Sequence, residues 1–435
     1  MPRPLSTLAL PLCAVLTFTA GCTVIYQRPD DPAELPMAKV RPGISVFLAD
    51  SVAVLRNKKV ALLTNQTAVD EKGKSDADLL RTDARAVGAG IQLVALMSPE
   101  HGLGGNADHE NIASTRDSST GLPVYSLYAN QTVPPPDSLL KSVDVVAIDL
   151  QDIGSRTWTY EGAMVYTMRA AARLNKPVVI FDRPNPITGS IVEGPMLDSA
   201  LSNPDDPASG KPGLAYALGP IPLRHGMTMG ELARYYNASL NIKADLHVIP
   251  VVGWRREVWF DRTGLPFIQP SPNLPSFHSV MLYPALVPFE ATNISVGRGS
   301  TDAFQIVGAP WLNTKQVIQV LKDQVVRGVR FLPLDFTPLG ASDKKYEGQL
   351  IHGIRIEVTD RSALQTTRLA ANLFAALHRV HPTEFTVDTL RFDRLLGSPA
   401  VRQALLKGED PDAVVDRSYG PAYTFREQVK RYLLY

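Results

Sequence analysis

The sequence predicts an α/β protein built on a parallel β-sheet, and three features support this prediction. Four apolar runs are rich in Val, Ile and Leu without polar alternation, which is typical of strands buried on both faces. The segment 162–175, between the last two runs, has the apolar spacing of a helix, as in a βαβ unit. Each run also ends in polar residues. The runs are KKVALLTN (58–65), IQLVALMSPEHG (91–102), VDVVAIDLQD (143–152) and KPVVIFDRPNP (176–186).

The polar residues at the ends of these runs predict where a ligand binds. In an open parallel sheet, ligands bind outside the carboxyl ends of the strands. We therefore expect four sets of side chains to converge on one edge of the sheet, although solvated loops also collect polar residues. The sets are Thr64 and Asn65; Glu100 and His101; Asp149, Gln151 and Asp152; and Asp182, Arg183 and Asn185.

A Pro-rich passage, TGLPFIQPSPNLPS (263–276), indicates a boundary to a second and smaller part of the chain. Beyond it, helical patterns cover 314–326 and 362–380, and GIRIEVTD (353–360) has the pattern of a strand. This mixture predicts a mixed α/β domain. The last stretch, YTFREQVKRYLLY, predicts a helix whose apolar end is buried.

Composition and motifs exclude several classes of function. The 435 residues carry a formal net charge of +1 and no basic tail or stripe, so we expect no nucleic-acid partner. No G-x-G-x-x-G follows a strand and no P-loop motif occurs, so a nucleotide cofactor is not supported. H-E-x-x-H and cysteine ligand sets are also absent from the sequence. We therefore predict no cofactor and no metal.

The first residues have the pattern of an export signal. The apolar stretch 5–20 leads into TAGC, which is similar to a bacterial lipoprotein box with Cys22 as the lipidated residue. Cys13 would leave with the signal, and 23–43 then reads as a Pro-rich spacer behind a lipid anchor. Because Thr23 rather than aspartate follows the cysteine, we expect the periplasmic side of the outer membrane. A plain secretory signal cut nearby is the alternative.

Glu100 is the leading candidate for a general acid. It follows an apolar strand, and the glycines behind His101 leave room for a ligand at its side. His101 could orient the acid or bind substrate. Two alternatives stay open: both side chains could merely hold the following turn, or the two histidines and three acids of EHGLGGNADHE (100–110) could bind a metal ion.

The loop DLQDIGSRTWTYEG (149–162) has a composition that suits a sugar. Aromatic rings stack on pyranose faces, and carboxylates, amides and guanidinium groups bind hydroxyls and anions. FEATNISVGRG (289–299) repeats this mixture. The alternative for the first loop is a helix cap, in which Asp152 is the capping residue and Arg156 pairs with it.

These segments stand in an order that resembles one family. From about residue 45 to the C-terminus, the chain resembles the NamZ-type exo-β-N-acetylmuramidases, formerly a bacterial domain of unknown function. The resemblance implies a Rossmann-like N-terminal domain, a smaller C-terminal domain that completes the cleft, and release of terminal N-acetylmuramic acid from the non-reducing end of peptidoglycan fragments. The motifs are SPEHGLGGNAD, TGLPVYSLY, DLQDIGSRTWTY, FDRPNPITG, RHGMTMGELA, PSPNLPS and LYPALVPFEATNISVGRGS.

Position by position, the resemblance implies that Glu100 is the catalytic acid, with His101 and Asp152 beside it. The matching positions for substrate binding are Asn65, Asp149, Gln151, Arg156, Tyr160, Arg183, Asn185, Glu290, Asn293 and Arg298. The chain departs from the family pattern at Ser98, Gln66 and Ser300, where glycine, histidine and threonine are usual.

We therefore divide the chain into four parts and expect an exported glycosidase of cell-wall turnover and recycling. Two alternatives stay open: a lipoprotein that binds peptidoglycan without cleaving it, and a metal-dependent hydrolase of another class. The expected partners are peptidoglycan-derived glycans or muropeptides, and the membrane through Cys22. The parts are a signal peptide (1–21), a tether (22–42), a Rossmann-like catalytic domain (43–268) and a C-terminal α/β domain (269–435).

Overall fold

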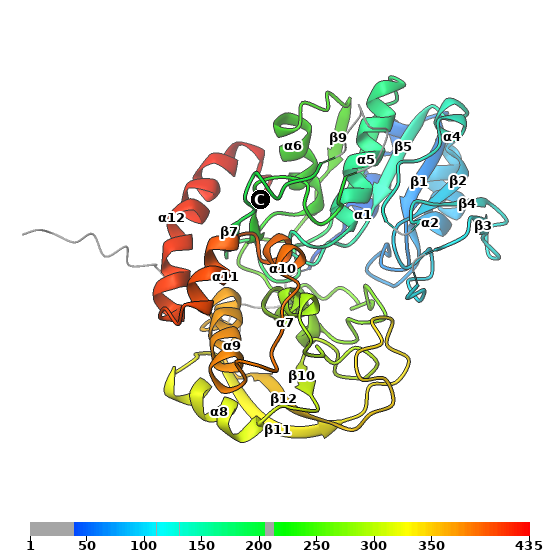
Figure 1. Cartoon of the computed structure of the whole chain (residues 1–435). Coiled ribbons are helices and arrows are strands. Elements are labelled where there is room, and N and C mark those ends of the chain that lie inside the picture. Colours follow the sequence, from blue (N-terminus) through cyan, green and yellow to red (C-terminus); the bar gives the residue numbers. More distant parts are fainter. Residues whose placement is uncertain (1–38, 110, 130, 205–212) are drawn as a thin grey trace, which may run out of the picture.

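The computed structural model describes residues 39–109, 111–129, 131–204 and 213–435 (Figure 1). The expected signal peptide, Cys22 and almost all of the expected tether lie outside the described residues. Within the part of the chain that is described, no helix has both the length and the apolar character needed to cross a bilayer.

A seven-stranded sheet forms the first part of the molecule, in the order β3-β4-β2-β1-β5-β6-β9. Every neighbouring pair is parallel except β3 and β4. Without β3, the chain order across the sheet is 3-2-1-4-5-6, which is the Rossmann order. The predicted parallel sheet is confirmed. The strands are β1 (Lys59–Thr64), β2 (Gln92–Ser98), β3 (Thr115–Arg116), β4 (Pro123–Ser126), β5 (Val145–Asp149), β6 (Val178–Phe181) and β9 (Leu246–Ile249).

Both faces of this sheet are buried, which explains why its strands show no polar alternation. In β1, Ala61 and Leu63 belong to the large apolar core on one face, and Val60 and Leu62 belong to a smaller core on the other. Successive side chains of a strand point to opposite faces, so each face needs its own apolar set.

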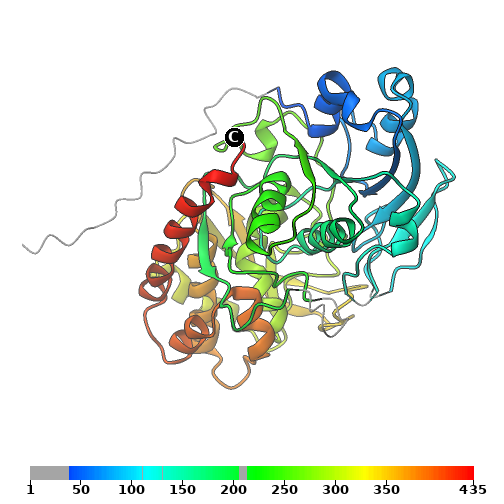
Figure 2. The same cartoon turned by 90° about the horizontal axis from the view of Figure 1, so that it is seen from above.

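Helices cover the two faces of the sheet (Figures 1 and 2). Helices α4, α5 and α6 contribute to the large core, whereas α1, the short turns η2 and η3, α2 and α3 contribute to the small one. These elements are α1 (Gly43–Val46), η2 (Phe47–Ser51), η3 (Val52–Leu55), α2 (Asp76–Thr82), α3 (Ala84–Gly88), α4 (Asp137–Lys141), α5 (Tyr160–Arg173) and α6 (Met229–Ser239).

The second part is smaller and holds the three-stranded antiparallel sheet β10-β12-β11 with helices around it, as Figure 1 shows. The prediction of a smaller mixed α/β part is confirmed. Its elements are α7 (Phe277–Leu286), η5 (Val287–Ala291), β10 (Ile306–Ala309), α8 (Thr314–Asp323), β11 (Val329–Phe336), β12 (Ile351–Val358), α9 (Thr366–Val380), α10 (Thr389–Leu396), α11 (Pro399–Leu406), α12 (Pro411–Val429) and η6 (Lys430–Tyr432).

The two parts share one continuous apolar core, so their loops are held in a fixed relation. The connecting chain adds the antiparallel pair β7 (Glu193–Met196) and β8 (Pro222–Arg224) and the turn η4 (Phe260–Arg262). The helix predicted over the last thirteen residues ends early, at Val429, because the chain then turns back. Beyond it, the Tyr435 hydroxyl accepts a hydrogen bond from the N–H of Val251 and donates one to Asp182, two residues that lie just past the ends of β9 and β6.

Candidate active site

The four predicted sets of polar residues lie at the carboxyl edge of four adjacent strands, β2, β1, β5 and β6. Thr64 at the end of β1 pairs in register with Asp149 at the end of β5. The strand order reverses between these two strands, which is the point where doubly wound sheets bind ligands. The sequence prediction that these sets converge is therefore confirmed by the topology.

Glu100 lies just beyond β2 and is partly exposed. Its Oε2 accepts a hydrogen bond of 2.5 Å from Oγ1 of Thr159, the residue that precedes the first turn of α5. The acid therefore bridges the ends of β2 and the loop after β5. A hydroxyl that donates to Oε2 leaves Oε1 as the oxygen that can carry a proton.

His101 is buried and has the positive backbone angle φ 71°, which is unusual for a residue with a side chain. Its Nδ1 donates to the carbonyl oxygen of Ala107 at 2.7 Å, which closes the glycine-rich turn. Gly105 has φ 66°, and a Cβ atom there would lie 1.9 Å from the side chain of Gln66. Only glycine lets the turn approach Gln66 this closely. Gln66 itself donates to the carbonyl of Gln269 at 2.8 Å.

Asn65 and Tyr160 form one buried chain of hydrogen bonds. The amide of Asn65 donates to the Tyr160 hydroxyl at 2.9 Å, and that hydroxyl donates to the Pro270 carbonyl at 3.0 Å. Burial, with the nearby charge of Glu100, raises the pKa of Tyr160 far above its ordinary value, so its proton stays in place. Both residues are expected to bind substrate. In this structure they hold the loop that contains Pro270 against the sheet.

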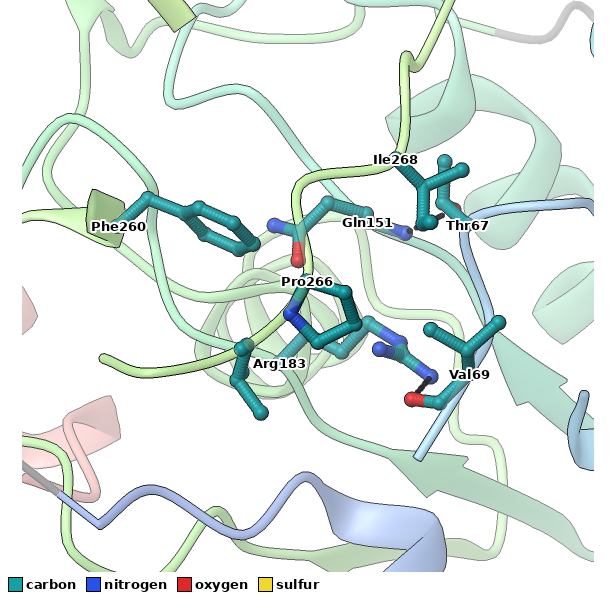
Figure 3. Close-up of a pocket in the computed structure, with 8 residues that line it drawn as sticks. Thr67, Val69, Gln151, Arg183, Phe260, Pro266 and Ile268 are labelled. Atoms are coloured by element: carbon teal, nitrogen blue, oxygen red, sulfur yellow. Dashed lines mark hydrogen bonds between the residues drawn. The ribbon is translucent and has the colours of Figure 1, made fainter. Parts of the chain in front are cut away.

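Asp149 and Arg183 form a buried bidentate ion pair. Arg183 also donates to the carbonyl of Val69 at 3.0 Å (Figure 3). The adjoining cavity is about 10 Å³, enough for one water molecule and too small for a sugar. Gln151 lines the same cavity and donates to the carbonyls of Asp152 and Pro184, at 2.7 and 2.9 Å. These predicted substrate ligands therefore bind one another or the backbone and hold the sheet edge.

Three other predicted substrate ligands bind the backbone. Arg156 is buried and donates to the carbonyls of Tyr216 and Leu395, at 2.9 and 2.8 Å. Burial lowers its pKa to about 10. It also does not take Asp152 as its partner, as the helix-cap alternative required. Asn185 and Asn293 likewise donate to backbone carbonyls at 2.9 and 2.7 Å, and each accepts a backbone N–H. In this structure these side chains hold the backbone in place, and their expected part in substrate binding stays a prediction.

Arg298 comes from the second part and reaches the loop behind Glu100. Its Nε and Nη2 bond Oε1 of Glu290 at 2.6 and 2.5 Å, and its Nη1 lies 3.7 Å from Oδ1 of Asp108. Burial opposes the charge of Arg298, but Glu290 and Asp108 outweigh it and raise its pKa. Asp108 also accepts a hydrogen bond of 2.9 Å from the side-chain amide of Asn273. Of the contacts that Arg298 makes with these two acids, that of Nη1 is the longest, so Nη1 is the nitrogen of this guanidinium most open to another anion.

Aromatic side chains connect the surroundings of Glu100 with Arg298. The ring of Trp158 lies 6.4 Å from His101 and 5.9 Å from Tyr283, and Tyr283 lies 4.8 Å from Phe304. The guanidinium of Arg298 sits 5.7 Å above the Phe304 ring. These rings are buried in the shared core, and they link an acid from the first part with a cation from the second. An acid together with a guanidinium group is a combination expected of a site for an anionic sugar.

Sequence reasoning gave no role to three residues of this region, Thr159, Glu161 and His225, and considered Asp108 only as one of the acids of 100–110 that could bind a metal ion. Thr159 and Glu161 stand in the segment 149–162, whose composition alone does not distinguish them from their aromatic and charged neighbours. His225 stands in RHGMTMGELA, a motif recognised without a role for its histidine. Asp152, expected as a catalytic group, is 2% exposed and faces Glu161 and His225 instead of an open surface.

Comparisons with known proteins cover almost the whole chain. Residues 60–278 match the family model described as exo-beta-N-acetylmuramidase NamZ, N-terminal, and residues 281–435 match its C-terminal counterpart. The models meet just beyond the Pro-rich passage 263–276, and the division between 268 and 269 stays a prediction.

A curated relative, peptidoglycan beta-N-acetylmuramidase NamZ of Bacillus subtilis (strain 168), is 36% identical over 399 residues, which are 91% of this chain and 92% of the relative. Two solved structures of DUF1343 family proteins from Bacteroides fragilis NCTC 9343 are also similar. One has a TM-score of 0.80 and 31% identity and covers 92% of this chain and 100% of its own. The other has a TM-score of 0.69 and 30% identity and covers 91% and 99%. The chain belongs to the NamZ family of exo-β-N-acetylmuramidases.

Proposed function

We propose that this protein is an exo-acting glycoside hydrolase that releases N-acetylmuramic acid from the non-reducing end of peptidoglycan fragments. The relative from Bacillus subtilis, peptidoglycan beta-N-acetylmuramidase NamZ, matches over nine-tenths of both chains. The observation that carries the proposal within this structure is Glu100, a partly exposed carboxyl group that Thr159 fixes at the carboxyl edge of the sheet, next to its switch point.

Glu100 would act as the general acid. A glycosidic oxygen is a poor leaving group until it is protonated. As the bond between the anomeric carbon and this oxygen breaks, the proton of Glu100 passes to the leaving oxygen. The OH of a water molecule ends on the anomeric carbon, and the other proton of that water passes to the solvent, from which Glu100 is reprotonated. Thr159 holds Oε2, so the proton travels from Oε1. His101 keeps the turn behind Glu100 closed through its bond to Ala107.

Arg298 would recognise the sugar as a muramic acid. N-acetylmuramic acid differs from N-acetylglucosamine by a lactyl ether that ends in a carboxylate, and a guanidinium group suits a carboxylate. Nη1 of Arg298 has only the long contact of 3.7 Å with Asp108, whereas Glu290 already occupies the other two nitrogens. The carboxylate of the sugar would therefore approach Nη1.

The envelope location extends this proposal. The segment TAGC before a Pro-rich spacer favours a lipid-anchored protein on the periplasmic side of the outer membrane, with Cys22 as the anchor. The product would then feed cell-wall recycling. A finely placed acid has no use in a protein that only binds peptidoglycan, so we prefer the enzyme to the binding protein.

One assay separates the candidate functions. The purified protein is incubated with a chromogenic β-muramide and with a disaccharide that carries N-acetylmuramic acid at its non-reducing end. We expect release of free N-acetylmuramic acid from both, unchanged by a chelator. Binding without release would favour the peptidoglycan-binding protein, and loss of activity with a chelator would favour a metal-dependent hydrolase.

A further inference from the structure

Three ionisable side chains meet in the interior behind the loop that follows β5. Nε2 of His225 lies 3.4 Å from Oδ2 of Asp152 and 3.4 Å from Oε1 of Glu161. All three side chains are at most 2% exposed. Asp152 comes from the loop, Glu161 from the first turn of α5, and His225 from the segment between β8 and α6. We call this group the buried trio.

Each member of the trio presents a buried polar atom without a hydrogen-bond partner among the described residues: Oδ1 of Asp152, Oε1 of Glu161 and Nε2 of His225. Buried polar atoms are almost always paired, and leaving three of them unpaired in one place is costly. The three groups must therefore share something. A metal ion or a set of shared protons could satisfy them, because one ligand atom of each residue lies within 4.8 Å of the others.

The hydrogen bond at Nδ1, the other ring nitrogen of His225, favours shared protons over a metal ion. The backbone N–H of Met227 donates to Nδ1 of His225 at 3.0 Å, so Nδ1 carries no proton. The proton of the neutral ring is therefore on Nε2 and points between the two carboxyl groups. A histidine that binds a metal almost always donates its second N–H to an acceptor. In this protein the second nitrogen faces a donor, so a metal on Nε2 would need a fully deprotonated ring.

The two carboxyl groups are not equivalent. Two carboxylates this close cannot both be ionised in a dry interior. Burial, with the charge of Asp152, raises the pKa of Glu161 well above its ordinary value. The Tyr236 hydroxyl donates to Oε2 of Glu161 at 3.0 Å, which leaves Oε1 for the proton, on the side of His225. Asp152 accepts a hydrogen bond of 2.5 Å from the backbone N–H of Gly154, and it can also accept hydrogen bonds from Glu161 and His225.

We propose that Asp152, Glu161 and His225 share protons around a single negative charge on Asp152, and that this trio positions the first turn of α5 so that Thr159 meets Glu100. The three are positioning residues, since none contacts the surface at which a substrate would lie. Glu161 is two residues after Thr159, and Asp152 is seven before it, so the trio clamps both sides of the residue that bonds the acid. The catalytic consequence rests on the proposed function.

The first test compares rescue by amides at the two acids. Glutamine has the shape of a protonated glutamic acid, and it can accept from Tyr236 and donate to Asp152. We therefore expect Glu161→Ala to lower kcat by about tenfold or more and Glu161→Gln to restore most of it. At Asp152 we expect Asn to be no better than Ala, because both remove the charge that His225 and Glu161 surround. KM should change little in all four variants. Rescue at Asp152 and not at Glu161 would overturn the assignment of the charge.

The second test does not depend on activity. Nitrogen-15 NMR of the histidine rings in the wild-type protein should show that His225 is a neutral ring with its proton on Nε2. The ring is assigned with His225→Gln. A proton on Nδ1, or a metal retained at one equivalent per chain after purification, would overturn the proposal. If the trio passes this test and the wild type releases no sugar, the proposed function fails and the proton arrangement stands.

Discussion

The hydroxyl of Thr159 donates to Oε2 of Glu100 at 2.5 Å, and this bond joins the residue before α5 to the end of β2. The two residues are 59 positions apart in sequence. They meet because β2, β1 and β5 are neighbours in the sheet, so the loops after them share one edge. The candidate acid is therefore oriented by the loop that lies across the switch point.

Removing this hydroxyl should affect turnover more than binding. Thr159→Val keeps the shape of the side chain but removes the donor, so Glu100 loses its fixed orientation. We expect kcat on a muramic acid disaccharide to fall by about tenfold, with KM changed by less than about threefold. Thr159→Ser keeps the hydroxyl and should retain most activity. Equal losses in the two variants would show that the hydrogen bond has no part in turnover.

Arg298 should discriminate between sugars with and without a lactyl group. Arg298→Lys keeps a charge but loses the planar fork, so Glu290 and the substrate can no longer be held together. We expect kcat/KM for a chromogenic β-muramide to fall by about tenfold or more, which corresponds to one strong charge-assisted contact. Arg355→Lys, which changes a partly exposed arginine paired with Asp302, is the matched control. If both variants cleave the muramide like the wild type, the assignment of Arg298 is wrong.

The sequence predicted the sheet and its edge because both follow from local patterns. An apolar run without alternation can be recognised in six or seven residues, and the polar residues behind it necessarily fall at its end. Which of those residues stay free for a ligand depends on partners far along the chain. Arg156 donates a hydrogen bond to the carbonyl of Leu395, and Asn185 donates one to the carbonyl of Met227. No local pattern records such bonds, so several residues with the composition of a sugar site turned out to hold loops together.

Asp182 should make the stability of the protein depend on pH. Burial raises its pKa to about 6, although Tyr435, Thr228 and Gly230 donate to its carboxylate. An unfolded aspartate has a pKa near 3.9. Between these values the folded state holds a proton that the unfolded state has lost, so stability falls as pH rises from about 4 to about 6. The loss is about 2–3 kcal/mol from this group.

The measurement is chemical unfolding of the wild type and of Asp182→Asn from about pH 4 to 7. Other groups titrate in both proteins, so the difference between the two isolates Asp182. Relative to the variant, the wild type should lose stability as pH rises. A difference that is flat with pH, or that changes in the opposite direction, contradicts the raised pKa.

Cys22 should decide where the protein is found in the cell. The segment TAGC precedes a Pro-rich spacer, and a lipid on Cys22 would hold the domain at the membrane. We expect Cys22→Ser to move the protein from the membrane fraction to the soluble fraction, with the muramidase activity of the released domain unchanged. Mass spectrometry of the wild type should show the acyl groups. Unmodified Cys22, or an unchanged fractionation of the variant, would count against the anchor.

Glu100→Gln is the most direct test of the chemistry. The amide fills the same space and can still accept from Thr159, but it cannot give a proton to the glycosidic oxygen. We expect the fold and substrate affinity to survive and kcat on a natural disaccharide to fall by about 10²–10⁴-fold. The loss should be smaller for a nitrophenyl muramide, because nitrophenolate leaves with little protonation. Equal losses on both substrates would point to a nucleophilic or structural role. Nearly full activity on the disaccharide would remove Glu100 from the chemistry and make Glu290 the next acid to replace.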